Sequence, residues 1–195
     1  MSGRPAAFLD RDGTLNELVP DPTGVPESPL RAADVRLIEG AAVAARQLAQ
    51  AGFALVCVSN QPVAAKGKVS LERLHAVHQR VLELLREEGV HLDAFRLCLH
   101  HPQGVVPELS GPCACRKPAP GMLLDAAEEL NLDLARSWML GDTDSDVIAG
   151  HAAGCRVVLI EHPGSAHKRT AEASPDRVAS SLADGVAQLL DRRSR

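Results

Sequence analysis

Short runs of consecutive apolar residues alternate along this chain with longer stretches in which apolar residues recur every three or four positions. The short runs are rich in Val, Leu and Ile, and each stops close to a polar residue. They cover Ala6–Leu9, Phe53–Val58, Trp138–Leu140 and Arg156–Ile160. Such runs are typical of strands that are buried on both faces of a parallel sheet.

The periodic stretches predict helices between and after these strands. Leu71, Leu74 and Val81, for example, fall on one face of a helix. The predicted helices cover Gly40–Ala51, Ser70–Glu88, Gly121–Leu130, Asp144–Ala153 and Leu182–Leu190. Strands that alternate with helices predict an open α/β sheet of parallel strands, in which ligands bind at the carboxyl ends of the strands.

Two segments follow neither pattern. Residues Asn16–Asp34 contain four prolines, and His100–Pro120 is rich in Pro, Gly and Cys. Long connections without regular structure are usually functional in compact domains, so we expect both to lie as loops over the carboxyl edge of the sheet. We expect residues 1–195 to form a single domain whose charged tail, 191–195, frays.

The amino-acid composition excludes several classes of protein and of binding partner. Of the 195 residues, 45% are hydrophobic and 24% are charged, which excludes a disordered or low-complexity chain. Aromatic residues make up 2% and the net charge is −4 with scattered basic residues, so no nucleic-acid partner is expected. No apolar stretch approaches the roughly 20 residues of a membrane span, and the N-terminus lacks a signal-peptide pattern. We therefore expect a cytoplasmic monomer that acts on a small molecule.

A pair of carboxylates follows the first predicted strand, in the sequence Asp10-Arg11-Asp12-Gly13-Thr14. Asp10 then emerges at the strand end with Asp12 beside it. In such a pair one carboxylate can stay ionised as nucleophile or metal ligand, while the other, with a raised pKa, carries a proton. The same pattern also occurs in capped turns and calcium loops, so by itself it leaves catalysis open.

Three further polar residues, Ser59, Lys117 and Asp142, lie at a predicted strand end or in a loop that faces one. A hydroxyl and an ammonium group can hold phosphoryl oxygens, and Asp142 together with Asp146 adds the negative charge that Mg²⁺ requires. Taken singly, Ser59 is better interpreted as the N-cap of a helix, and Lys117 as a solvated surface charge.

Three of the five cysteines cluster with histidines in the second irregular segment. They are Cys98, Cys113 and Cys115, near His100 and His101. Three thiolates and one imidazole are the ligand set of a structural zinc site, whereas an odd number of cysteines fits a disulfide framework poorly. Reduced thiols in a loop are the alternative, and the spacing leaves both histidines open as the fourth ligand.

Four motifs in this order, DRDGT, SN, K and GDxxxD, resemble those of the haloacid dehalogenase (HAD) superfamily of phosphatases. The resemblance spans Phe8 to Gly154. It implies a Rossmann-like parallel sheet with helices on both faces, no large cap domain, and a bound Mg²⁺. It also implies that Asp10 attacks phosphorus to form an aspartyl-phosphate and that Asp12 acts as acid and base. Mg²⁺ would be bound by Asp10, Asp142 and the main-chain oxygen of Asp12.

The cysteine-rich segment narrows the resemblance to one branch. It reads CLHHP and then CACRKPAPGM, similar to the zinc-bearing D,D-heptose 1,7-bisphosphate and histidinol-phosphate phosphatases. The first His is the ligand in that branch, which favours Zn²⁺ bound by Cys98, His100, Cys113 and Cys115. Zinc would stiffen the loop that presents Arg116 and Lys117. The implied substrate-binding residues are Ser59, Asn60, Gln61, Arg116 and Lys117.

The resemblance implies a Mg²⁺-dependent phosphatase that converts D-glycero-D-manno-heptose 1,7-bisphosphate to the 1-phosphate. Histidinol phosphate is the alternative substrate. The sequence departs from the branch at Pro62–Gly67, where relatives carry a Ser-Gly-Ile stretch and an Arg-Gly, and at the Pro-rich Leu18–Pro29. The resemblance implies that these loops determine which leaving group is accepted, so substrate identity is the expectation that the departures affect. A module that only binds a phosphorylated ligand or a partner is expected to lack Asp10 or Asp12, and both are present.

Overall fold

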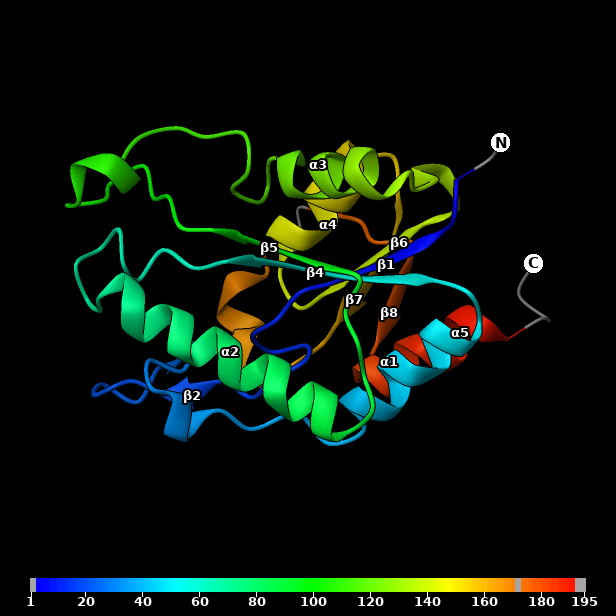
Figure 1. Ribbon diagram of the computed structural model, residues 1–195, viewed down its shortest axis with the longest axis horizontal. Coiled ribbons are helices and arrows are strands. Elements are labelled where there is room, and N and C mark those ends of the chain that lie inside the picture. Colours follow the sequence, from blue (N-terminus) through cyan, green and yellow to red (C-terminus); the bar gives the residue numbers. More distant parts are fainter. Residues whose placement is uncertain (1–2, 171–172, 192–195) are drawn as a thin grey trace.

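The structure, a computed structural model, describes residues 3–170 and 173–191 and is built around a six-stranded sheet (Figure 1). The strand order is β5-β4-β1-β6-β7-β8, and every pair of neighbouring strands is parallel. The strands are β1 (Ala6–Leu9), β4 (Ala54–Asn60), β5 (Ala94–Cys98), β6 (Trp138–Gly141), β7 (Arg156–Ile160) and β8 (Arg177–Ala179). The predicted open parallel sheet is confirmed.

The four predicted strands form the middle of this sheet, and the two that were not predicted, β5 and β8, form its edges. The residues of β1 are all buried, because β4 and β6 flank it and helices cover both of its faces. In the edge strand β5 only Cys98 is buried and the other residues are partly or largely exposed, and β8 has only three residues. Neither edge strand therefore carries the continuous apolar run that identifies the central strands.

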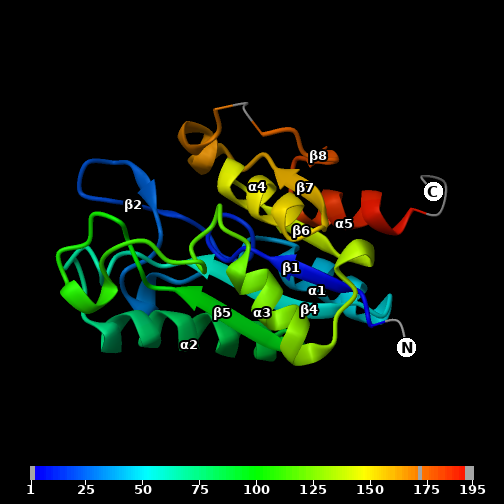
Figure 2. The same cartoon turned by 90° about the horizontal axis from the view of Figure 1, so that it is seen from above.

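Helices cover the sheet on both faces, as predicted. The helices α1 (Ala41–Gln50), α2 (Leu71–Glu87) and α5 (Leu182–Leu190) lie on one side, and α3 (Gly121–Leu130) and α4 (Asp144–Ala152) on the other (Figures 1 and 2). The hydroxyl groups of Ser70 and Ser181 accept hydrogen bonds from the first turns of α2 and α5, so these helices begin where the sequence supplies an N-cap.

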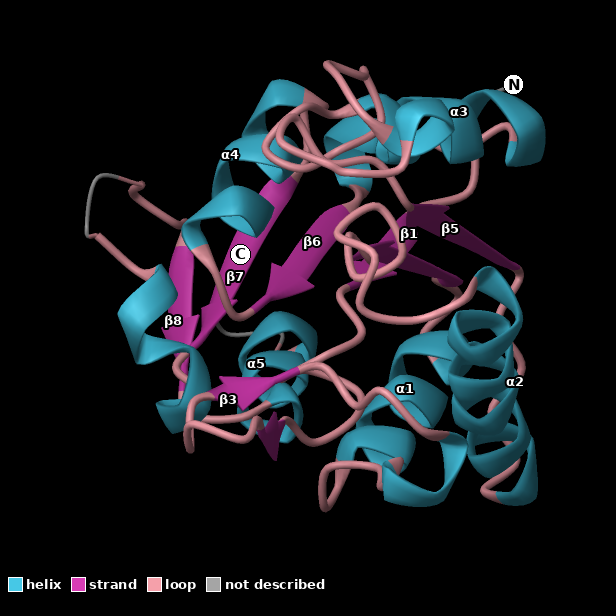
Figure 3. Ribbon diagram, turned by 90° about the vertical axis from the view of Figure 1, so that its left-hand side faces the viewer, coloured by secondary structure: helices cyan, strands magenta, loops and turns pink. Residues whose placement is uncertain are grey.

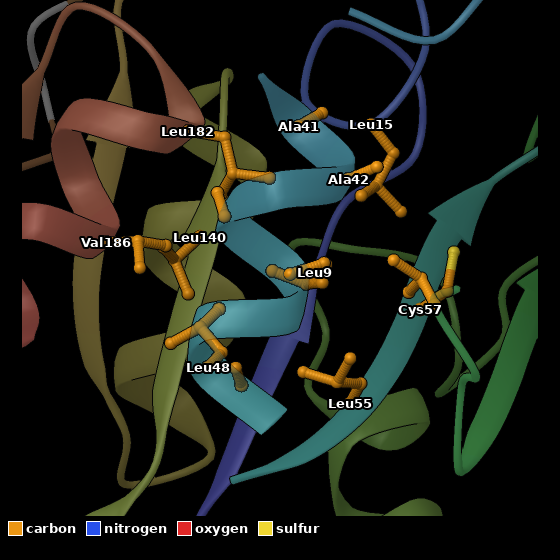
Figure 4. Close-up of a cluster of buried hydrophobic side chains, with 14 of the residues drawn as sticks. Leu9, Leu15, Ala41, Ala42, Leu48, Leu55, Cys57, Leu140, Leu182 and Val186 are labelled. Atoms are coloured by element: carbon orange, nitrogen blue, oxygen red, sulfur yellow. The ribbon is translucent and has the colours of Figure 1, made fainter. Parts of the chain in front are cut away.

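The apolar core is divided by the sheet into two layers. Leu9 and Leu140 point toward α1 and α5, where they pack with Leu48 and Leu182 (Figure 4). Side chains of the opposite face, such as Phe8, Met139 and Val157, pack with Met122 and Leu123 of α3 and with α4. Because neighbouring residues of a strand point to opposite faces, this double burial fixes the strands and hence the residues at their carboxyl ends.

The first irregular segment contains more regular structure than the sequence predicts. Two of its prolines, Pro20 and Pro26, lie within a two-stranded antiparallel pair, β2 (Val19–Pro20) and β3 (Pro26–Glu27), so the expectation of an unstructured loop is wrong for this part. Short 3₁₀ helices cover Ala32–Asp34, Pro107–Leu109, Leu134–Arg136 and Pro163–Lys168. Both irregular segments lie at the carboxyl edge of the sheet, onto which Figure 3 looks.

No large cap domain stands over this edge in the part of the chain that the structure describes. None of the helices among the described residues combines the length and the apolar character that a membrane span requires. Of the tail that is predicted to fray, residues 192–195 lie outside the described residues.

Candidate active site

A cavity of about 690 Å³ opens at the carboxyl edge of the sheet, and the strand ends supply its floor. Asp10 follows β1, Ser59 and Asn60 end β4, and Asp142 follows β6. The cysteine-rich loop adds Arg116 and Lys117. The topology thus brings together residues that are far apart in the sequence, as expected for strand ends of one parallel sheet.

Lys117 lies at the centre of this site and is 3% exposed. Its Nζ is 2.6 Å from Asp10 Oδ1 and 2.5 Å from Asp146 Oδ1, and it donates a hydrogen bond of 2.8 Å to the carbonyl oxygen of Val58. Asn60 holds the main chain of Lys117 with two hydrogen bonds, of 2.9 and 3.1 Å. The reading of Lys117 as a solvated surface charge is therefore wrong.

Asp146, whose role the sequence left open, has two structural functions. One carboxylate oxygen pairs with Lys117, and the other accepts hydrogen bonds from the main-chain N–H (3.0 Å) and hydroxyl (2.7 Å) of Thr143. The bond from the Thr143 N–H is one half of a capping box that begins α4, and in the other half the main-chain N–H of Asp146 donates to the Thr143 side chain. Asp146 thereby links the start of α4 to the buried ammonium group.

Three carboxylates, those of Asp10, Asp142 and Asp146, have oxygen atoms within 4.8 Å of one another and form what we call the carboxylate cluster. Burial, together with the charges of Asp10 and Asp146, raises the pKa of Asp142 to about 8. Burial also raises the pKa of Asp10 to about 6, although Lys117 acts in the opposite direction. One ammonium group thus faces three buried carboxylates, so the carboxylate cluster carries an excess of negative charge when all three are ionised.

The carboxylate cluster fits a hard divalent cation. Oδ1 of Asp142 is buried and has no hydrogen-bond partner among the described residues. Gly13, at φ 86°, lets this side chain approach, because a Cβ atom there would lie 2.1 Å from Asp142 Oδ2. Buried carboxylate oxygens are the ligands that Mg²⁺ prefers, and the ion would supply the missing charge.

Asp12 has a different environment from Asp10. The fully buried guanidinium group of Arg11 donates to both of its oxygens, at 2.8 to 3.1 Å, and Asn16 and Gln61 donate at 2.9 and 2.5 Å. Burial alone would raise the pKa of Asp12, but Arg11, Asn16 and Gln61 hold it below its ordinary value. The expectation that the proton-carrying carboxylate of the pair has a raised pKa is therefore wrong for Asp12, since the raised pKa belongs to Asp10. The sequence did not assign Arg11 or Asn16 a role, and their place within the DRDGTLN stretch is the one signal that could have suggested it.

Ser59 is 1% exposed and belongs to β4 rather than to a helix end. Its hydroxyl accepts a hydrogen bond of 3.0 Å from Gln61. The reading of Ser59 as a helix N-cap is therefore wrong, since α2 is capped by Ser70. Ser59 and Gln61 place a hydroxyl and an amide next to the two carboxylates that follow β1.

The four predicted zinc ligands, Cys98, His100, Cys113 and Cys115, lie together and form the cysteine cluster. Their sulfur atoms are 3.1 to 3.6 Å apart, and Nδ1 of His100 is 3.9 and 3.4 Å from the sulfurs of Cys98 and Cys115. Ligands of a tetrahedral ion with Zn–S bonds of about 2.3 Å are separated by roughly 3.8 Å, so this donor set fits zinc. Nδ1 of His101 instead accepts a hydrogen bond from the main chain of Gln103, which leaves it outside the cluster.

The cysteine cluster adjoins the cavity. Cys115 is followed directly by Arg116 and Lys117, and the Arg116 guanidinium donates to the carbonyl oxygen of His100 at 3.3 Å. An ion bound there would therefore restrain Arg116 and Lys117, the two cationic residues of this loop that line the cavity.

Comparison with known proteins places these features in a family. Residues 114–185 match the family model described as HAD-hydrolase-like. The chain is 41% identical over 181 residues to the D-glycero-beta-D-manno-heptose-1,7-bisphosphate 7-phosphatase of Yersinia pestis, which covers 92% of both chains. It is 39% identical over 181 residues to the protein of the same name from Escherichia coli (strain K12), which covers 92% of this chain and 91% of that protein.

Two solved structures share the fold closely. One is a putative HAD-like phosphatase from Mesorhizobium loti, with 35% identity, a TM-score of 0.79, and coverage of 96% of this chain and 86% of that one. The other is the D,D-heptose 1,7-bisphosphate phosphatase of B. bronchiseptica in complex with magnesium and phosphate. It has 31% identity and a TM-score of 0.78, and covers 95% of this chain and 98% of that one.

Proposed function

Because the chain belongs to the family of HAD-like phosphatases that contains the D-glycero-beta-D-manno-heptose-1,7-bisphosphate 7-phosphatases, we propose that it removes the 7-phosphate of this heptose bisphosphate. The observation that carries the proposal is the buried Asp10, which lies at a strand end in ion-pair contact with Lys117 at the floor of a cation-lined cavity. The products are the heptose 1-phosphate and inorganic phosphate.

Asp10 is the nucleophile in this proposal. The 2.6 Å contact with Lys117 favours its carboxylate form, which can attack phosphorus. A bond forms between a carboxylate oxygen of Asp10 and phosphorus while the bond from phosphorus to the C7 oxygen breaks. Lys117 and Ser59 stabilise the charge on the equatorial phosphoryl oxygens. Asp10, Asp142 and the main-chain oxygen of Asp12 would bind Mg²⁺, which supplies further positive charge for the same purpose.

Asp12 moves the protons. In the first step it donates one to the leaving C7 oxygen, and the negative charge of a bound phosphoryl group favours this protonated form by raising the pKa of Asp12. In the second step the carboxylate takes a proton from the water that attacks the aspartyl-phosphate. Arg11, Asn16 and Gln61 stabilise the carboxylate form that this second step requires.

The second phosphate of the substrate has cationic partners in the same cavity. Its lining includes Lys66, Lys68, Arg116 and Lys168 besides Lys117. A guanidinium group can bind phosphate through two hydrogen bonds, so we assign the 1-phosphate to Arg116. Histidinol phosphate, in contrast, brings a cationic amine that these residues would repel.

Zinc in the cysteine cluster has a structural role in this proposal. A closed shell of three sulfurs and one nitrogen leaves no position for a reacting water, so the ion orders the loop and takes no part in the chemistry. Cytoplasmic location, a monomeric state and the absence of a nucleic-acid partner stay predictions from the sequence.

The test is a phosphate-release assay with both anomers of the heptose 1,7-bisphosphate, the heptose 7-phosphate and histidinol phosphate. We expect the bisphosphate to have the highest kcat/KM. Arg116→Ala should lower that value roughly 10- to 150-fold, the effect of one charge-assisted contact, and leave the 7-phosphate almost unchanged. Arg73→Ala, which removes an exposed arginine on α2, is the matched control.

Two results would contradict the substrate assignment. If histidinol phosphate has the higher kcat/KM, the alternative substrate is correct. If Arg116→Ala impairs the 7-phosphate as much as the bisphosphate, Arg116 does not bind the second phosphate group.

A further inference from the structure

A second cavity, of about 660 Å³, lies at the amino ends of the strands, whereas the active site lies at their carboxyl ends. Trp138 and Arg156 are the first residues of β6 and β7, and Arg177 is the first residue of β8. Together with Arg136 they line this cavity, which the end of α5 closes on one side. The amino ends of the strands lie on the right in Figure 1, away from β2 and the active-site loops. A substrate in the active site therefore does not reach it.

The strand register places the side chains that line this cavity on one face of the sheet. Trp138 is the register partner of Arg156, and Val158 is that of Arg177. Because Arg156 and Val158 are two residues apart, the side chains of Trp138, Arg156 and Arg177 project to the same face. Farther along the strands this face is covered by apolar residues of α1 and α5. Arg156 and Arg177 thus lie on a face of the sheet that is otherwise hydrophobic.

Both guanidinium groups pack against the same tryptophan ring. The Cζ atom of Arg156 is 4.1 Å from the ring centroid of Trp138, and that of Arg177 is 5.2 Å from it. Trp138 is 3% exposed, so its ring is a fixed surface, and Arg177 also donates to the carbonyl oxygen of Gln188. These contacts order the two cations before any ligand binds, which lowers the entropy that binding costs.

The three arginines of this cavity form no ion pair with any described carboxylate, whereas five other described arginines do. Arginines that do have an acidic partner are Arg4 with Asp93, Arg11 with Asp12, Arg46 with Glu88, Arg80 with Glu83, and Arg96 with Glu129. The cavity lining includes one acid, Asp191, against three arginines. Like charges that converge on one cavity repel one another, and a bound anion removes that repulsion.

We infer that this cavity is a second anion site, which binds a small molecule carrying two or more phosphate groups. Guanidinium groups bind phosphate oxygens in pairs, and three of them from separate segments can neutralise more than one phosphate. The apolar part of the lining, from Phe53 and Leu190, is suited to the carbon skeleton between the phosphates. The cavity volume is that of a small-molecule site rather than of a protein interface.

Trp138 provides a direct measurement of this binding. It is the one tryptophan of the chain, and the chain has no tyrosine, so the intrinsic fluorescence of the protein reports this cavity. The metal-loaded protein is titrated with fructose 1,6-bisphosphate and with inorganic phosphate at constant ionic strength. Asp10→Asn protein is used to prevent turnover. We expect a saturable fluorescence change, with tighter binding of the bisphosphate.

Arg136→Gln is the principal variant, because Arg136 is exposed and forms no ring contact with Trp138. It should weaken the bisphosphate at least tenfold, the effect of one lost charge-assisted contact, and Arg156→Gln should do the same. Arg73→Gln on α2 makes the same change in net charge away from the cavity and should leave binding unchanged.

Several results would overturn the inference. A fluorescence response that does not saturate, or that Arg136→Gln and Arg156→Gln leave intact, would show that no site exists here. A signal that depends on protein concentration and is insensitive to phosphates would identify the cavity as a surface for self-association. Phosphate release by the wild-type protein is measured in parallel, so a failure of the proposed function remains distinguishable from a failure of this site.

Discussion

The carboxylate cluster and the cysteine cluster are assembled in different ways. The acids follow the central strands β1 and β6 or lie in the first turn of α4, so hydrogen-bonded and packed elements position each of them. The cysteine cluster begins at the end of the edge strand β5 and is completed by a loop whose regular structure is one short 3₁₀ helix. The sheet and α4 thus position the carboxylate cluster, whereas the cysteine cluster itself cross-links the loop that carries it.

This difference predicts different consequences of losing each ion. Without Mg²⁺ the acids stay in place, because the sheet and α4 do not depend on the ion, and the chemistry is lost. Without zinc the loop that carries Arg116 and Lys117 loses its cross-link, and the positions of these cations in the cavity become less defined. The ion bound by oxygen ligands is thus expected to act in the reaction, and the ion bound by sulfur ligands to fix the positions of Arg116 and Lys117.

The largest expected effect comes from Asp10→Asn. The amide has almost the same shape but cannot attack phosphorus, so we expect kcat to fall by about 10³-fold or more. The fold should persist, because removing one of three crowded carboxylates also removes repulsion from Asp142. Phosphate release measures the first effect and a thermal melt the second. Activity above a few per cent of the wild type would exclude Asp10 as the nucleophile.

Asp12→Asn separates proton transfer from the structure around it. Loss of general acid–base help should lower kcat by roughly 10²–10⁴-fold. Asp12→Ala is a poorer test, because it leaves the guanidinium group of Arg11 buried without its carboxylate, a loss of about 3–5 kcal/mol in the free energy of unfolding. Asn keeps one accepting oxygen for Arg11 and the shape of the side chain but not the negative charge, so the melting temperature of this variant is measured together with its rate. An unchanged rate with a normal melting temperature would mean that another group supplies the proton.

The central fold could be predicted because its signals are local. The apolar run of β1 and the periodic pattern of α2 each identify an element without reference to the rest of the chain. The edge strand β5 could not be identified in this way, because its stability comes from pairing with β4, where Asn60 is the register partner of Cys98. Such a contact joins segments that sequence periodicity treats separately.

The same reasoning explains which site residues were recognised. The motif order brought Asp10, Asp142 and Lys117 into one hypothesis, but their contacts depend on the topology of the sheet. The pairing of Lys117 with Asp146 arises from tertiary packing and leaves no pattern in the sequence, because both residue types are also common on protein surfaces. Arg11 and Asp12 are neighbours in the sequence, but nothing in the residue types says that both side chains are buried and paired.

Zinc removal tests whether the cysteine cluster orders the loop that carries Arg116 and Lys117. Cys113→Ser should abolish the expected one zinc ion per chain, raise KM about tenfold or more, and increase proteolysis within residues 99–116, while Mg²⁺ still supports residual turnover. Cys155→Ala is the matched control, because Cys155 is a buried thiol outside the cysteine cluster. Elemental analysis and steady-state kinetics give the result. Zinc-free protein with the full kcat/KM would show that the cysteine cluster does not position the cations.

The smallest expected effect is a pH dependence that only the carboxylate cluster should have. In the metal-free protein the pKa of Asp142 is about 8 and that of Asp10 about 6, because both are buried near other carboxylates. Protons therefore compete with Mg²⁺ below pH 8, and the Mg²⁺ concentration that gives half-maximal activity should rise as the pH falls from 8 to 6. One competing proton limits the change to about tenfold per pH unit, and the curve should level off above pH 8.

Asp142→Asn is the matched variant for this measurement, because it removes the titrating group while keeping its size. It should need far more Mg²⁺ and should lose most of the pH dependence between pH 7 and 8. Zinc content, measured in the same samples, should stay constant over this range if the two clusters bind their ions independently. A half-maximal Mg²⁺ concentration that does not change between pH 6 and 8 would mean that protons do not compete with the ion. Groups of the protein itself would then balance the charges of Asp10 and Asp142. The carboxylate cluster, like the cysteine cluster, would act mainly by fixing the positions of side chains.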